Sequence, residues 1–91
     1  MSMNWYVYLL LCADDSYYTG ITTDPQRRLL EHNTDDKKGA KYTRARRPLT
    51  MVYFEPCQSR SAAASREYEI RKSSRKKKIA LASSMKDHWS A

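Results

Sequence analysis

Apolar residues gather at the start of the chain, and their spacing predicts a strand pair. Residues 5–12 run from Trp5 to Cys12 with hardly a polar side chain, and aromatic and aliphatic residues of this kind favour a strand. Because successive positions are apolar, we expect this strand to be covered on both faces. Residues 13–16, Ala-Asp-Asp-Ser, have turn chemistry, and residues 17–21 then form the return strand of a hairpin.

The register of this hairpin decides which side chains share a face of the sheet. If Leu10 lies opposite Tyr18, which needs a loop of an odd number of residues such as 13–15, then Tyr8 and Tyr18 point to the same side. A slip of one residue separates the two phenols by the thickness of the sheet. A site that uses both phenols requires the first arrangement.

The next segment carries the signals of a helix start. Asp24 supplies a side-chain acceptor at the N-cap and Pro25 occupies the first helical position, where its missing N–H costs nothing. We expect a helix from Pro25 to residue 32 or 33, on which Arg28 and His32 lie one turn apart on one face. Residues 33–47 are polar and basic and predict a loop, with one irregular helical turn at residues 40–44.

The second half of the chain alternates strand and helix signals. Leu49 to Glu55 predicts a third strand, which we expect Pro56 to stop. A second helix is expected from a serine cap at Ser59 or Ser61 to about residue 72.

Length and composition indicate one small domain followed by a short tail. Ninety-one residues with 41% apolar side chains are enough for one hydrophobic core. Residues 75–82 predict a short basic helix, and the small polar residues of 83–91 predict a partly frayed tail. We therefore expect a single domain over residues 1–82 and a C-terminal tail over residues 83–91.

The charge of the chain is uneven and points to a polyanionic partner. The formal net charge is +7, yet residues 1–36 hold two basic and six acidic side chains, whereas residues 37–78 hold fourteen basic and three acidic ones. A basic block of this size attracts polyanions and speeds encounter with them. The alternative is a solvated, solubilising surface.

Other classes of protein find little support in the sequence. The longest apolar run, residues 6–13, is too short to span a bilayer, and no basic segment precedes it, so we expect a cytoplasmic protein without membrane contact. Cys12 and Cys57 form no C-x-x-C pair and have no flanking histidines, so no zinc site is predicted.

Glu67 is the most informative carboxylate. With Ala63 and Ile70 it follows the spacing of an inward helical stripe, whereas Glu69 faces outward. An acid on an inward face needs a partner, because an unpaired buried charge is costly. A divalent metal ion is one such partner and a nearby arginine is the other, and the sequence leaves both open.

Three further groups of residues are candidates for chemistry or binding. Arg28 and His32 follow closely on the hairpin that carries Tyr18, although a lone arginine or histidine on a short helix is more often a surface group. A basic loop with one aromatic residue suits backbone contacts and base stacking on nucleic acid. Its members are Lys37, Lys38, Lys41, Tyr42, Arg44, Arg46 and Arg47. The run from Arg75 to Lys78 fits a second phosphate contact or a solvated helix equally well.

Taken together, these residues resemble the signature of the GIY-YIG nuclease superfamily, and most closely its small single-domain bacterial members. The motifs that carry the resemblance are Tyr6-Val7-Tyr8, Tyr18-Thr19-Gly20, Arg28, His32 and Glu67, with Gly39 to Arg44 and Arg66-Glu67-Tyr68 in support. The resemblance covers roughly residues 4–80. It departs from the family pattern at Tyr6, which replaces a glycine, and at Thr19, which replaces an aliphatic residue.

The resemblance implies an α/β (α+β) fold with a three-stranded antiparallel sheet flanked by helices. It also implies hydrolysis of a phosphodiester assisted by one divalent metal ion, Mg²⁺ in the first place and Mn²⁺ as the alternative. By position, Tyr8 matches the tyrosine of the first triplet and Tyr18 that of the second. Arg28 and His32 match the family arginine and histidine, and Glu67 matches the single metal ligand.

The predicted function is therefore a metal-dependent DNA endonuclease of DNA repair or processing, with no small-molecule cofactor. Tyr8 is expected to help activate the nucleophile, and Arg28 to stabilise charge on the phosphoryl oxygens. Two alternatives remain. One is a catalytically weak nucleic-acid-binding module of the same fold, and the other is a nuclease subunit that acts with a protein partner.

Overall fold

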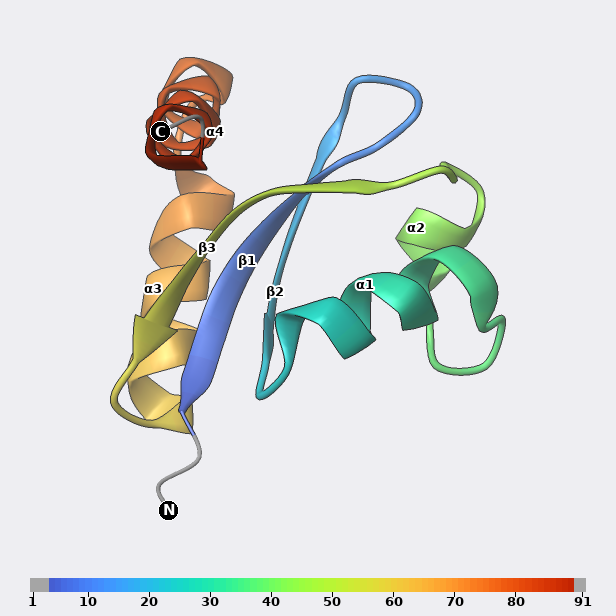
Figure 1. The fold of residues 1–91 in the computed structure, drawn as a ribbon, viewed down its shortest axis with the longest axis horizontal. Coiled ribbons are helices and arrows are strands. Elements are labelled where there is room, and N and C mark those ends of the chain that lie inside the picture. The colour runs from blue at the N-terminus through green and yellow to red at the C-terminus, as the bar shows by residue number, and fades with distance from the viewer. Residues whose placement is uncertain (1–3, 90–91) are drawn as a thin grey trace.

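A three-stranded antiparallel sheet with helices on both sides forms the body of the protein (Figure 1). The computed structural model describes residues 4–89, with side chains placed as far as Met85. In chain order the elements are β1 (Trp5–Leu11), β2 (Tyr17–Thr22), α1 (Pro25–Thr34), α2 (Lys41–Arg44), β3 (Thr50–Cys57), α3 (Arg60–Lys72) and α4 (Arg75–Trp89). The strand order is β2-β1-β3, which confirms the predicted α+β fold.

The central strand β1 separates two small cores. Tyr8 and Leu10 point towards α1, whereas Val7 and Leu9 point to the other face, where they pack with Ile70 of α3. All five side chains are buried, so the prediction of a strand covered on both faces is confirmed. The two cores explain why polar residues are missing from this strand.

The hairpin has the register that lets the two phenols meet. Leu10 pairs with Tyr18, and the Cys12 amide donates to the Ser16 carbonyl at 2.8 Å, which closes a loop over residues 13–15. Asp15 takes a left-handed conformation at φ 67°, which a short polar side chain tolerates in a tight turn. Tyr8 and Tyr18 therefore lie on the same face of the sheet.

The helix starts follow the predicted caps. The Asp24 carboxylate accepts from the Arg27 amide at the start of α1, and the Ser59 hydroxyl accepts from the Ala62 amide at the start of α3. The irregular turn expected at residues 40–44 is α2, a single helical turn. These local signals were sufficient because each satisfies a backbone donor that the helix leaves free.

Most boundaries agree with the predictions to within a single residue, and two differ by more. Pro56 does not stop the third strand, which continues to Cys57. Because β3 pairs only with β1, it is an edge strand, where a residue without an N–H is tolerated. Helix α4 does not end at residue 82 but continues to Trp89.

Helix α4 is longer than expected, and its packing on β3 accounts for part of the added length. Leu81 of α4 packs against the core formed by Val7, Leu9 and Ile70. The division into a domain over residues 1–82 and a tail over residues 83–91 stays a prediction, and α4 crosses that boundary. Within residues 4–89, every helix is too short or too polar to cross a bilayer.

Candidate active site

A hollow of about 390 Å³ opens at the outer edge of β2, where α1 and α3 approach this strand from opposite sides of the sheet. Four of the five predicted catalytic side chains line it: Tyr8 from β1, Tyr18 from β2, Arg28 from α1 and Glu67 from α3. The remaining lining residues are Thr19, Gly20, Ile21 and Arg71. The structure thus brings two phenols, a guanidinium and a carboxylate together in one place.

The two phenols are neighbours on the sheet. Their ring centroids are 6.5 Å apart, and Gly20 lies directly opposite Tyr8 in the strand pairing. A Cβ atom at Gly20 would overlap the hydroxyl of Tyr8. The glycine of the second triplet is therefore required by space, since only a residue without a side chain leaves room for the Tyr8 hydroxyl.

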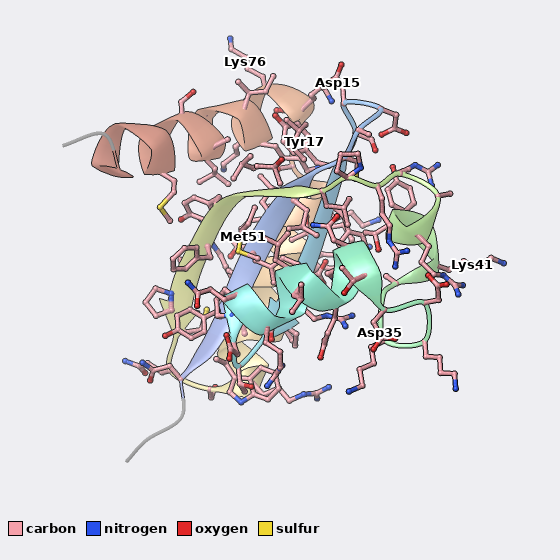
Figure 2. All side chains as sticks on the ribbon, turned by 45° about the vertical axis from the view of Figure 1, so that its right-hand side comes forward. Asp15, Tyr17, Asp35, Lys41, Met51 and Lys76 are labelled. Atoms are coloured by element: carbon pink, nitrogen blue, oxygen red, sulfur yellow. The ribbon has the colours of Figure 1, made fainter. Side chains whose placement is uncertain are left out.

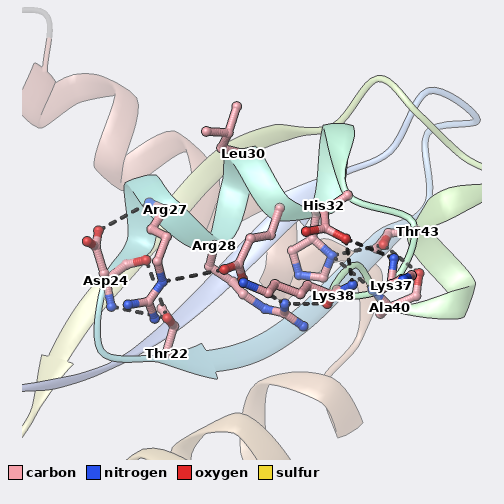
Figure 3. Close-up of polar contacts among 12 residues, drawn as sticks. Thr22, Asp24, Arg27, Arg28, Leu30, His32, Lys37, Lys38, Ala40 and Thr43 are labelled. Carbon is pink, nitrogen blue, oxygen red and sulfur yellow. Dashed lines mark hydrogen bonds and ion pairs between the residues drawn. The ribbon is translucent and has the colours of Figure 1, made fainter.

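His32, the fifth predicted residue, lies behind Tyr8 rather than in the hollow. It is fully buried, with Nε2 2.8 Å from the Tyr8 hydroxyl. Its Nδ1 lies 2.9 Å from the Thr43 hydroxyl (Figure 3). The Thr43 hydroxyl donates its single proton to the Ala40 carbonyl at 2.9 Å. This arrangement favours the tautomer with the proton on Nδ1, which leaves Nε2 to accept from Tyr8. The Ala40 amide makes only a long contact of 3.5 Å with Nδ1.

Burial keeps both members of this pair neutral at pH 7. It raises the pKa of Tyr8 to about 12, against the opposing effect of the nearby Arg28 guanidinium. It lowers the pKa of His32 to about 4, and the Arg28 charge lowers this pKa further. The phenol proton therefore stays on Tyr8 in the free protein, and the imidazole of His32 that is hydrogen-bonded to it is neutral.

Arg28 is held at the rim of the hollow by two acceptors. Its Nη1 donates to the Glu31 carboxylate at 3.1 Å and to the Lys38 carbonyl at 2.6 Å (Figure 3). The second bond ties α1 to the basic loop. Burial raises the pKa of Tyr18, the Arg28 charge opposes this shift, and the Glu67 carboxylate adds to it. A phosphate bound in the hollow would therefore meet a positive charge that is already held in position.

Glu67 has an ion-pair partner on its own helix. The Nε of Arg71, which lies one turn further along α3, donates to Glu67 Oε2 at 2.8 Å. The Glu67 side chain is 20% exposed and the Arg71 side chain is 52% exposed. Ion pairs this exposed contribute only about 0–1 kcal/mol, so a bound cation or phosphate displaces Arg71 at low cost. Of the two partners that the sequence left open, the arginine is present here.

Glu67 also fits a magnesium site. No group of three or more histidine, cysteine, aspartate or glutamate side chains is placed to hold a metal ion within the described residues, so Glu67 would act alone. Mg²⁺ prefers oxygen ligands, keeps several waters and is often held by one or two carboxylates together with substrate phosphates. A single carboxylate in a hollow open to a phosphodiester meets that requirement.

The basic loop is more constrained than its sequence suggested. Arg46 pairs with Asp14 at 3.0 Å, and its guanidinium lies 3.7 Å from the centre of the Tyr42 ring. Arg47 pairs with Asp36 at 2.8 Å and donates to the His32 carbonyl at 2.7 Å. The exposed members of the loop are Lys37, Lys38, Lys41, Tyr42 and Arg44.

Two residues of the site were missed by sequence reasoning. Thr43 is fully buried and fixes the orientation of His32, but a threonine in a polar loop gives no signal of this role. Arg71 lines the hollow and neutralises Glu67. It could have been found, because a basic residue four positions after an inward glutamate on a helix is a recognisable ion-pair spacing.

Comparison with protein families gives one match over most of the chain. The family model described as the GIY-YIG catalytic domain matches residues 4–80. The UPF0213 protein DP2720 of Desulfotalea psychrophila is 48% identical over 87 residues, which covers 96% of this chain and 78% of that protein. The UPF0213 protein HQ_3675A of Haloquadratum walsbyi is 54% identical over 77 residues, covering 85% and 84% respectively.

Solved structures of similar chains have the same fold. The solution NMR structure of the UPF0213 protein BH0048 from Bacillus halodurans superposes with a TM-score of 0.54 at 48% identity, covering 89% of this chain and 84% of that one. The solution NMR structure of the protein EF2693 from E. faecalis gives a TM-score of 0.56 at 44% identity, covering 85% and 80%.

Proposed function

The chain belongs to the GIY-YIG catalytic domain family, a family of nucleases, and on this premise we propose that it is a divalent-metal-dependent endonuclease that hydrolyses phosphodiester bonds in DNA. The observation that carries the proposal is the shared hollow at the β2 edge. Tyr8, Tyr18, Arg28 and Glu67 come from four different elements and line one opening. A purely structural role for any one of them does not require this convergence.

Proton transfer is the task of Tyr8 and His32. A water molecule that attacks phosphorus must lose a proton, and Tyr8 accepts it while passing its own phenolic proton to His32 Nε2, 2.8 Å away. Because Tyr8 gives up its own proton as it accepts one, no free phenolate forms, which the pKa of about 12 disfavours. The imidazolium formed on His32 is disfavoured in turn, because burial lowers the pKa of His32 to about 4, so it can exist only briefly. Thr43 holds the imidazole in the tautomer that can accept the proton.

The other groups of the hollow position the phosphate and stabilise its charge. Arg28 lies where it can stabilise negative charge on the phosphoryl oxygens, and its bonds to Glu31 and Lys38 hold it there before substrate arrives. Tyr18 positions the water or the phosphate. Glu67 would hold a Mg²⁺ ion, which supplies charge stabilisation at the phosphate and the leaving oxygen when bound.

The test compares two glutamates of the same helix. Glu67→Gln removes the charge that faces the hollow, whereas Glu69→Gln removes a charge that is exposed on the outer side of α3. The variants and the wild type are incubated with Mg²⁺ or Mn²⁺ and a panel of single-stranded, nicked, flap and duplex DNA. We expect Glu67→Gln to lower the cleavage rate by a factor on the order of 10²–10³, as for loss of a major electrostatic stabiliser, and Glu69→Gln to cleave as the wild type does.

Binding is measured on the same panel without divalent metal. Retained binding by Glu67→Gln together with lost cleavage supports the enzyme. A wild-type protein that binds DNA but cleaves nothing on the panel would contradict the proposal and favour the binding module. Equal cleavage by the wild type and Glu67→Gln would exclude Glu67 as the metal ligand.

A further inference from the structure

The end of α3 carries an exposed tyrosine beside two cations, one of which lines the hollow. Tyr68 is 55% exposed, with the Arg71 guanidinium carbon 5.3 Å and the Lys72 ammonium 5.7 Å from its ring centre. These residues are three and four positions apart and so share one face of the helix. We call Tyr68, Arg71 and Lys72 the α3 platform.

Arg71 connects this platform to the hollow. It lines the hollow itself and donates to Glu67, the residue that precedes Tyr68 in the chain. The platform therefore adjoins the hollow through Arg71, which belongs to both.

The basic surface continues from the platform onto the start of α4. Arg75 donates to the Asp15 carbonyl at 2.6 Å and lies over the Tyr17 ring, which fixes α4 beside the hairpin loop. Lys76 points away from the body of the molecule (Figure 2). Lys76 and Lys77 are exposed, and no acidic side chain of the described residues pairs with either. Charge of one sign without internal partners is what a polyanion complements.

The other exposed tyrosine beside the hollow is less suited to stacking on a base. Tyr42 has the Arg46 guanidinium 3.7 Å from its ring centre and stacks on Tyr18 with 6.1 Å between the centroids. Arg46 is in turn held by Asp14. The Tyr42 ring thus contacts Tyr18 and Arg46 within the protein, whereas the Tyr68 ring is more exposed and its two cations lie farther from the ring centre.

We infer that the α3 platform is a nucleotide-binding subsite, which stacks an unpaired base on Tyr68 while Arg71 and Lys72 contact the flanking phosphates. This inference rests on the proposed function, because it places the subsite next to the phosphate that would be cut. Bases inside a duplex are covered on both faces by their neighbours, so the Tyr68 ring selects a strand that is single-stranded beside the cut. Base stacking on an aromatic side chain contributes about 1–3 kcal/mol per base.

The first test separates stacking from charge. Binding of a labelled oligothymidylate and of an abasic oligonucleotide of equal length and charge is measured by fluorescence anisotropy without divalent metal. Tyr68→Ala is expected to weaken binding of the oligothymidylate by about 5–150-fold and to leave the abasic strand unchanged, whereas Tyr68→Phe binds both as the wild type does. Unchanged binding of the oligothymidylate by Tyr68→Ala, or equal loss on both ligands, would overturn the inference.

The second test uses two cations of the same helix. Lys72→Gln removes a charge from the platform, and Arg60→Gln removes one from the other end of α3, about 18 Å away along the helix. Lys72→Gln should lower the salt dependence of single-strand binding by about 0.7 in the log–log slope, the value for one phosphate contact, and Arg60→Gln should not change it. Equal slopes for the two variants would contradict the subsite.

These measurements can fail independently of the proposed function. If the wild type cleaves nothing but Tyr68→Ala weakens oligothymidylate binding, the subsite is supported and the nuclease proposal is contradicted. If cleavage depends on Glu67 but Tyr68→Ala binds both strands normally, the nuclease proposal is supported and the subsite is contradicted.

Discussion

His32 is buried without charge, and this property affects stability as well as proton transfer. In the unfolded chain a histidine has a pKa near 6.5, whereas burial lowers the pKa of His32 to about 4. Between these two values the unfolded state binds more protons than the folded state. The folded protein is therefore fully stabilised above pH 6.5 and loses stability as the pH falls towards 4.

A variant at this position should remove that pH dependence. Wild-type protein is expected to lose about 3 kcal/mol from His32 alone between pH 7 and pH 4, measured as the free energy of unfolding in urea. His32→Gln keeps a polar side chain of similar reach but cannot be protonated, so its loss over this range should be smaller by that amount. Asp14 and Asp35 have lowered pKa values, so protonating them in acid destabilises the wild type and the variant alike. Their contribution cancels when the two proteins are compared. Equal acid sensitivity of the two proteins would show that His32 is not buried neutral.

At the scale of the elements, the pairing of β1 with β2 shapes the hollow. The register places Gly20 opposite Tyr8, and the space that a Cβ atom would fill is taken by the phenol. Tyr8 cannot turn away from an added methyl group, because it is 1% exposed and packed among the residues of its core. The strand pair and the proton relay therefore depend on the same glycine.

Gly20→Ala tests this dependence. We expect it to lower the free energy of unfolding by about 1–3 kcal/mol, as overpacking does, and to abolish cleavage because the hydroxyl is pushed away from His32. Tyr8→Phe should also abolish cleavage, and the double variant should cleave no less than Tyr8→Phe alone, since both changes break one relay. Cleavage is measured on a substrate from the DNA panel and unfolding in urea. Full activity of Gly20→Ala would show that the hydroxyl is not needed at its present position.

The same scale shows which parts of the fold the sequence could predict. The odd-numbered hairpin loop and the caps Asp24 and Ser59 were readable because each is a local requirement of the backbone. The prediction that Pro56 ends the third strand was wrong because strand order, which makes β3 an edge strand, is not a local property of the sequence. The extent of α4 was missed for a similar reason, since its packing on β3 joins segments far apart in the chain.

The candidate site shows the same division between local and distant effects. The helical spacing of Ala63, Glu67 and Ile70 was enough to orient the carboxylate, and Ala63 and Ile70 are buried as expected. The contact of Thr43 with His32 joins α2 to α1 across eleven residues, and no pattern in the sequence marks it. The chemical groups of the hollow could therefore be predicted from the sequence, whereas the contacts that hold them in place could not.

For the whole molecule, the arrangement of charge in space differs from its arrangement along the chain. The acidic side chains of the first third partly neutralise the basic loop, as in the pairs of Asp14 with Arg46 and Asp36 with Arg47. Lys72, Lys76 and Lys77 of α3 and α4 have no such acidic partner among the described residues. Within the described part of the chain, Lys37, Lys38, Lys41 and Arg44 of the loop also lack an ion pair, but Asp35 and Asp36 lie next to them in the chain, whereas residues 72–78 contain no acidic residue. We therefore expect the stronger positive field on the α3–α4 side of the hollow.

This asymmetry predicts the side from which nucleic acid approaches. Two variants that each lose three positive charges are compared, Lys37, Lys38 and Lys41 to Gln in the loop and Lys72, Lys76 and Lys77 to Gln on α3 and α4. Association rates with single-stranded DNA are measured by stopped-flow fluorescence at low and high salt. The α3–α4 variant should associate about tenfold more slowly than the wild type at low salt, and the loop variant should be less affected, because nearby carboxylates already reduce the field of the loop.

High salt provides the control for this comparison. The Debye length falls to about 3 Å at 1 M salt, so the difference between the two variants should vanish there if it arises from long-range steering. A difference that persists would indicate lost contacts in the complex instead. A loop variant slower than the α3–α4 variant at low salt would place the approach on the opposite side of the hollow, because steering follows the charge that internal ion pairs leave uncompensated.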